Sequence, residues 1–146
     1  MKENSIRRAV REGRAALGTQ LKEFASRGVP WIIEASGFDY VAIDHEHGAF
    51  DLETIADLAG WFQATDVSAI VRIHKSAAGL IPVILDQGIM GVQVSEVDSV
   101  EDAHAMHAAA GRSPNRSAAY YRSRPTAIRE TCRWPPGVRA FGDVLR

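Results

Sequence analysis

Strand-like and helix-like stretches alternate along residues 4–111, and this alternation constrains the fold more than any other feature. The candidate strands are Gly18–Leu21, Tyr40–Ile43, Ala69–Val71 and Gly91–Val94. Tyr40–Ile43 is too short for a helix and too continuously apolar for a half-exposed strand, as is typical of strands buried on both faces of a parallel sheet. Repeated strand–helix units with short connections predict parallel strands joined by right-handed helical crossovers.

Five segments show helical spacing or helix-capping residues. The expected helices cover residues 4–16, 28–36, the stretch capped by Asp51, 76–87 capped by Ser76, and 99–110 capped by Ser99. Pro82 lies inside the fourth, and because proline lacks an amide donor it should kink that helix or shift its start. Two α/β architectures compete, a doubly wound sheet and a (β/α)8 barrel. A full barrel needs about 250 residues, so this chain could supply about half of one.

Ionisable side chains gather where the Tyr40–Ile43 strand ends. They are Asp44, His45, Glu46, His47 and Asp51. Ligands bind at the carboxyl ends of parallel strands, where carboxylates and imidazoles can act as metal ligands, supporting partners or acid/base groups. A solvated polar turn is the alternative interpretation. No Gly-rich phosphate motif opens any helix, which weakens a nucleotide-binding interpretation.

Composition predicts a globular, cytoplasmic protein without a membrane partner. The 146 residues are 46% hydrophobic and 24% charged, and no apolar run approaches the roughly 20 residues of a membrane span. The first residues lead into a polar helix rather than the apolar core of a signal peptide. Cys132 is the single cysteine, so neither a disulfide framework nor a cysteine-based zinc site is expected.

The net charge of −1 hides two different parts. Residues 1–111 carry 9 basic and 16 acidic side chains, whereas residues 112–146 carry 8 arginines, 2 acidic side chains and four of the six prolines. We therefore expect a domain over 1–111 and an Arg/Pro-rich tail over 112–146. Tyr120, Tyr121 and Trp134 among these arginines could contact nucleic acid, but the lack of lysine and the scarcity of glycine disfavour that partner.

Several motifs in order resemble one enzyme family. They are Leu17-Gly18-Thr19, Gly37-Phe38-Asp39 followed by Asp44-His45-Glu46-His47, Val71-Arg72, Leu85-Asp86-Gln87-Gly88 and Val100-Glu101-Asp102-Ala103. In this order they resemble the N-terminal part of the HpcH/HpaI aldolases, which are metal-dependent class II pyruvate aldolases. The resemblance covers roughly residues 4–111 and implies a partial (β/α)8 barrel of about the first four βα units, belonging to the phosphoenolpyruvate/pyruvate-binding superfamily.

The resemblance also implies a chemistry. Family members cleave 4-hydroxy-2-oxo acids, of the 2,4-dihydroxyhept-2-ene-1,7-dioate or 2-dehydro-3-deoxyglucarate type, to pyruvate and an aldehyde. A divalent metal, Mg²⁺, Mn²⁺ or Co²⁺, stabilises the pyruvate enolate. The implied substrate is a small 2-oxo acid, and the implied assembly is a homo-oligomer.

Carried over residue by residue, the resemblance assigns three catalytic side chains. Arg72 would hold the substrate's carboxylate and keto oxygen, His47 would be the acid/base group, and Asp86 would orient that histidine. Asp44 and Glu46 would not touch the substrate but would contact these catalytic side chains. Asp86 falls near the end of a helix, so either a neighbouring subunit brings it to the site or its role is structural.

The chain departs from the family after residue 111. The family's Glu and Asp metal ligands lie beyond the matching stretch, so we expect no metal ligand in this chain and poor or no catalysis by it. A truncated chain produced by a reading-frame shift, or a natural short variant, would have this composition change. The alternative function is a catalytically inactive fragment or assembly partner with a basic tail.

Overall fold

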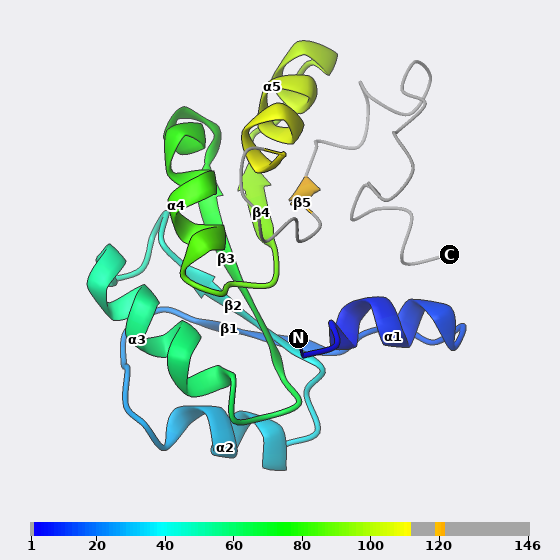
Figure 1. Cartoon of the computed structure of the whole chain (residues 1–146), viewed down its shortest axis with the longest axis vertical. Coiled ribbons are helices and arrows are strands. Elements are labelled where there is room, and N and C mark those ends of the chain that lie inside the picture. The colour runs from blue at the N-terminus through cyan, green and yellow to red at the C-terminus, as the bar shows by residue number, and fades with distance from the viewer. Residues whose placement is uncertain (1, 112–118, 122–146) are drawn as a thin grey trace.

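The computed structural model describes residues 2–111 and 119–121, which form one five-stranded parallel sheet (Figure 1). The strands lie in sequence order, so each neighbour in the sheet is also the next strand along the chain. They are β1 (Gly18–Leu21), β2 (Tyr40–Asp44), β3 (Ser68–His74), β4 (Val92–Ser95) and β5 (Ala119–Tyr121). This order and the parallel pairing confirm the predicted α/β class.

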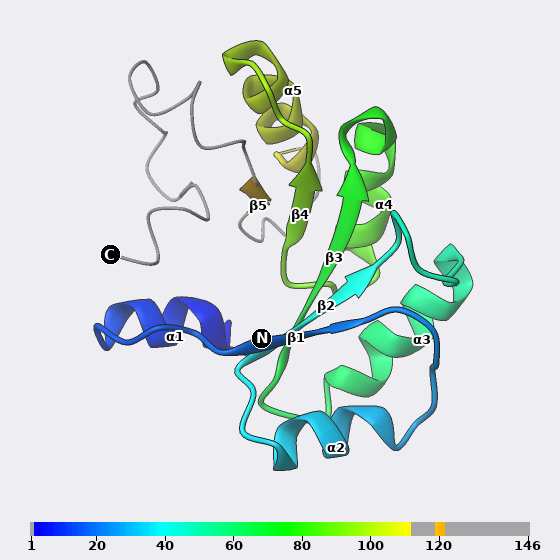
Figure 2. The same ribbon diagram turned by 180° about the vertical axis from the view of Figure 1, so that it is seen from behind.

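Helices connect the strands and cover one face of the sheet. They are α2 (Val29–Ala35), α3 (Leu52–Phe62), the 3₁₀ helix η1 (Lys75–Leu80) with α4 (Ile81–Asp86), and α5 (Val100–Ala110). Figures 1 and 2 show α2, α3, α4 and α5 following one another along that face, while α1 (Ser5–Arg11) stands apart from them. Among the described helices, none is both long and apolar enough to cross a bilayer.

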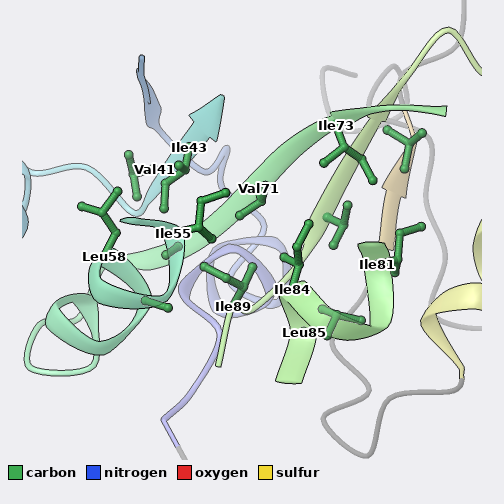
Figure 3. Packing of buried hydrophobic residues seen from close by; sticks show 14 of the residues in the cluster. Val41, Ile43, Ile55, Leu58, Val71, Ile73, Ile81, Ile84, Leu85 and Ile89 are labelled. Carbon is green, nitrogen blue, oxygen red and sulfur yellow. The ribbon is translucent and has the colours of Figure 1, made fainter. Parts of the chain in front are cut away.

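The main core fills the space between the sheet and these helices. Alternate strand residues such as Val41, Ile43, Val71 and Ile73 form one apolar cluster with helix residues that include Leu58 (Figure 3). All five side chains are fully buried. Because successive strand residues point to opposite faces, the residues between them, including Ala42 and Arg72, lie on the other face.

Helix α1 closes the end of the sheet where the strands begin. Its Ile6 packs on Ala42 and Ile70, on the face that the other helices leave open. The Ser5 amide donates to Ser68 Oγ at 2.9 Å, and Lys2 Nζ donates to two backbone carbonyls that precede β3. The opposite end of the sheet, where the strands finish, is therefore the open one.

The helix starting near Ser76 was predicted with the wrong cap. His74 is the N-cap residue, its ring accepting from the Ser76 amide, and a 3₁₀ turn precedes α4. Pro82 sits in the first turn of α4, so it shifts the start of the helix, as one of the two expected outcomes. α1 ends at Arg11 rather than residue 16, and Gly13 turns the chain with a φ of 73°.

β5 was not predicted, because no period of 2 or 3.6 marks residues 112–146. The interpretation of Trp134 and most of the arginine-rich tail lies outside the described residues. Five parallel strands with helices on one face are the geometry of part of a (β/α)8 barrel.

Candidate active site

The register of β2 and β3 places Asp44 beside Arg72 at the open end of the sheet. Both are on the face opposite the main core, and Asp44 is the last residue of β2. Arg72 Nη1 donates to Asp44 Oδ2 at 3.0 Å. Two predicted site residues from strands 28 positions apart in the chain are thus in direct contact.

Asp44 is fully buried and accepts hydrogen bonds on both oxygens. Its Oδ1 accepts from the Glu46 and His47 amides at 3.1 and 3.0 Å, and its Oδ2 also accepts from Gln20 Nε2 at 2.8 Å. Lys22 Nζ lies 3.5 Å from the same Oδ2. Burial opposes ionisation, but the amide donors and the Arg72 charge outweigh it, so the pKa of Asp44 lies below its ordinary value.

Glu46 provides the second anionic partner of Arg72. Its Oε2 lies 2.8 Å from Arg72 Nη2, and the two side chains are only 8% and 15% exposed. Within the described part of the chain no hydrogen bond is directed at this buried oxygen, so its contact with Arg72 is an ion pair. Arg72 is held by two carboxylates, one from the last residue of β2 and one from the turn that follows it, which fixes its guanidinium plane.

His47 lies at the rim of this cluster. Its backbone amide is bound by Asp44, while its side chain is 62% exposed with Nε2 3.4 Å from Glu46 Oε1. The tight turn that comes next depends on Gly48, where a Cβ atom would lie 2.0 Å from the Asp44 carbonyl oxygen. The Ala49 amide donates to the Lys22 carbonyl at 2.8 Å, which ties this turn to the end of β1.

A pocket of about 280 Å³ opens beside the cluster. Its lining residues are Gly18, Thr19, Gln20, Tyr40, Ala42, Arg72 and Gln93. They come from β1, β2, β3 and β4, and Arg72 belongs both to the pocket wall and to the ion cluster. The pocket therefore offers a small ligand direct access to the guanidinium group.

Asp86 is not brought into this cluster. It is the last residue of α4, and a crossover helix returns toward the ends where the strands begin. Its proposed role stays a prediction. His45 points elsewhere too, because its Nδ1 lies 2.8 Å from the Phe50 carbonyl oxygen.

Sequence reasoning missed Gln20 and Lys22, which both contact Asp44. The strand at Gly18–Leu21 has a weak apolar pattern, so its side chains were not assigned to a face. The pairing of Gln20 with Ala42 in the register of β1 and β2 puts Gln20 on the same face as Asp44. Strand alternation combined with parallel pairing was the signal that could have found it.

The cluster does not suit a divalent metal. Asp44 has no free oxygen, and Glu46 is paired with Arg72, so two cations already balance the two carboxylates. Within residues 2–111 and 119–121, no three His, Cys, Asp or Glu side chains are grouped to hold a metal ion. Mg²⁺ and Mn²⁺ favour several oxygen ligands, so these residues alone do not fit the metal that the family resemblance implies.

Curated relatives support the family resemblance. The chain is 31% identical over 109 residues to a hydroxypyruvate/pyruvate aldolase from Agrobacterium fabrum, a match covering 72% of this chain and 41% of the relative. It is 35% identical over 104 residues to a 4-hydroxy-2-oxovalerate aldolase from Novosphingobium aromaticivorans, covering 70% and 39%. A 28% identical match to the 4-hydroxy-2-oxovalerate aldolase of Rhodococcus jostii covers 97% of this chain and 46% of the relative. No protein-family model matches.

Solved structures share the fold. An HpcH/HpaI aldolase from Desulfitobacterium hafniense superposes with a TM-score of 0.61 at 24% identity, covering 70% of this chain and 39% of the other. An HpcH/HpaI aldolase/citrate lyase family protein from Burkholderia cenocepacia gives 0.67 at 17% identity, covering 82% and 59%. The chain thus spans less than half the length of the curated relatives it matches.

Proposed function

We propose, from the premise that this chain is related to the HpcH/HpaI aldolases, that it carries the 2-oxo-acid-binding part of an aldolase that cleaves 4-hydroxy-2-oxo acids to pyruvate and an aldehyde. The observation that carries the proposal is Arg72, a largely buried guanidinium that is fixed by two carboxylates and lines a pocket. The relatives' names share a 2-oxo acid and differ in the rest of the substrate. The 2-oxo acid is therefore the part that we assign here.

Arg72 would bind the carboxylate or keto oxygen of the 2-oxo acid. A guanidinium presents a rigid fork of donors, and negative charge that develops on an enolate strengthens its hydrogen bonds. Asp44 would hold the fork in place from the buried side. Glu46 Oε2, which lies 2.8 Å from Arg72 Nη2, would hold the other side of the fork.

His47 would move the proton in this scheme. Its ring is exposed and lies beside Glu46, which is paired with Arg72, so His47 would act on a ligand that Arg72 holds. A divalent metal would supply Lewis-acid stabilisation to the enolate in the family's chemistry. The described residues do not hold one, and we assign no step to it.

The second candidate function is binding without turnover, as expected of an inactive fragment or assembly partner. It is favoured by the pairing of both site carboxylates with cations, which leaves them unsuited to a metal. The cytoplasmic location, the homo-oligomeric state and the domain boundary at residue 111 stay predictions.

Calorimetric titration of the full chain with pyruvate tests the proposal. Replacing Arg72 with Met should weaken pyruvate binding by at least tenfold, because Arg72 is the single cation among the described residues that line the pocket. Arg11→Met is the matched control, since Arg11 is an exposed arginine on α1 paired with Glu3. Equal pyruvate affinity in both variants would overturn the assignment of Arg72.

A pyruvate-release assay then separates the two candidates. The full chain is supplied with a 4-hydroxy-2-oxo acid and Mn²⁺ or Co²⁺. Metal-dependent release of pyruvate at roughly 1–1000 per second supports the aldolase. Pyruvate binding without release supports the inactive binding protein.

A further inference from the structure

Three reactive side chains form a separate chain of contacts where β3 and β4 end. Ser76 Oγ lies 2.7 Å from His74 Nδ1, and Glu96 Oε2 lies 3.2 Å from His74 Nε2. The three residues come from the end of β3, the first turn of η1 and the loop after β4. The ion pairs that hold Arg72 involve none of them.

The hydrogen-bond partners of His74 indicate which of its ring nitrogens carries the hydrogen. An ionised carboxylate only accepts, so Nε2 carries the hydrogen and donates it to Glu96. Nδ1 then holds the lone pair, and it accepts from the Ser76 amide at 3.2 Å and from the Ser76 hydroxyl group. The hydroxyl hydrogen of Ser76 therefore points at a base, and its oxygen lone pairs face away from the ring.

The surroundings distinguish this group from an ordinary helix cap. Glu96 has a φ of 56°, a left-handed conformation that costs energy for a residue with a side chain and often occurs at functional sites. Ser95 is the register partner of His74, so both point to the same face of the sheet. The Ser95 hydroxyl is buried, in a residue 5% exposed, and has no hydrogen-bond partner among the described residues.

We propose that Ser76, His74 and Glu96 form a second reactive centre, in which Ser76 is a nucleophile for small activated carboxylic esters. A hydroxyl group within hydrogen-bond reach of a base that a third group orients is the general signature of an activated nucleophile. Ser76 is exposed and can meet a solvent-borne ester, whereas Glu96 acts through His74 as a positioning residue.

The reaction needs only water as a second reactant. Ser76 Oγ attacks the ester carbonyl carbon while its proton passes to His74 Nδ1, and Glu96 stabilises the imidazolium that results. The tetrahedral intermediate collapses as His74 gives this proton to the departing alcohol or phenolate, leaving an acyl-serine. Water then attacks the acyl carbon while His74 Nδ1 takes a proton from it, and His74 passes that proton to Ser76 Oγ as the carboxylic acid departs.

Acetylation of the full chain by p-nitrophenyl acetate, read at each residue by peptide mass spectrometry, tests the centre. Ser36 is the matched control, because it is also exposed and its hydroxyl donates to a backbone carbonyl at 2.8 Å rather than to a base. We expect Ser76 to be acetylated at least tenfold faster than Ser36.

Variants separate activation from simple exposure. His74→Gln keeps a side chain that can accept from Ser76 but removes the base, so the Ser76 rate should fall to that of Ser36. Glu96→Gln should give an intermediate rate. Circular dichroism verifies that each variant is folded. Equal rates at Ser76 and Ser36, or an unchanged Ser76 rate in His74→Gln, would leave only a helix cap and overturn the proposal.

Discussion

Replacing Asp44 with Asn tests how strongly the buried cluster supports the fold. Asn has a single acceptor oxygen, so its NH₂ group must face either the two loop amides or the Gln20 and Arg72 donors. In either orientation at least two accepted hydrogen bonds are lost, and the largely buried Arg72 loses one of its two anionic partners. Breaking a buried ion pair costs about 3–5 kcal/mol, and because Glu46 remains, we expect a loss near the lower value, about 3 kcal/mol of unfolding free energy.

Urea unfolding followed by circular dichroism measures this loss. With a slope of about 1–3 kcal/mol per molar urea, the midpoint should fall by about 1–3 M without a change in slope. Asp51→Asn is the matched control: it makes the same chemical change at the α3 N-cap, where Asn caps as well as Asp, so its cost should stay within about 0.5 kcal/mol. If the two variants lose equal stability, the Asp44 cluster does not hold this end of the sheet.

Two further predictions concern Asp44 and the turn that follows β2. The pKa of Asp44 is lower in the folded chain than in the unfolded chain, so its contribution to stability is present above the unfolded pKa of about 4 and is lost as the pH falls through the lower folded value. Below about pH 4, the urea midpoint of Asp44→Asn should therefore fall less steeply with pH than that of the unmodified chain. Parallel curves for the two proteins would contradict this. Gly48→Ala should destabilise the chain by about 1–3 kcal/mol, because its Cβ would lie 2.0 Å from a backbone oxygen. In the same urea assay, Gly60→Ala should stabilise it by up to about 1 kcal/mol, because position 60 is an exposed position of α3 where the added Cβ has no atom within 4 Å.

The fold was largely predictable because its signals are local. Asp51 and Ser99 were expected as helix caps, and each accepts a hydrogen bond from the amide three residues on. Gly37 was expected to end α2, and its φ of 79° fits that role. The helix cap after β3 was harder to predict, because both His74 and Ser76 can cap a helix there. Which of the two does so depends on the conformation of the turn, which the sequence does not specify.

The proximity of Asp44, Glu46 and Arg72 was predictable from the sequence, but their individual contacts were not, and Asp86 does not join them. The sequence indicated that Asp44, Glu46 and Arg72 lie at the same end of the sheet, since parallel strands finish at one edge. Their pairing depends on strand register and on side-chain conformations, which a single sequence does not specify. The contact of Gln20 with Asp44 depends on the pairing of β1 with β2, so it became visible only with the fold.

The segment that contains α1 can complete its docking only late in synthesis. The contacts of the residues that precede the helix reach far along the chain: Lys2 donates to the carbonyls of Phe62 and Val67, and Asn4 donates to the Met90 carbonyl. At a translation rate of about 5–20 residues per second, the ribosome needs roughly 4–17 s after making Asn4 to make Met90. The segment that contains α1 is therefore made well before the residues that it binds, and until they follow, Ile6 and the Ala42 and Ile70 surface that it covers stay open to solvent and to chaperones.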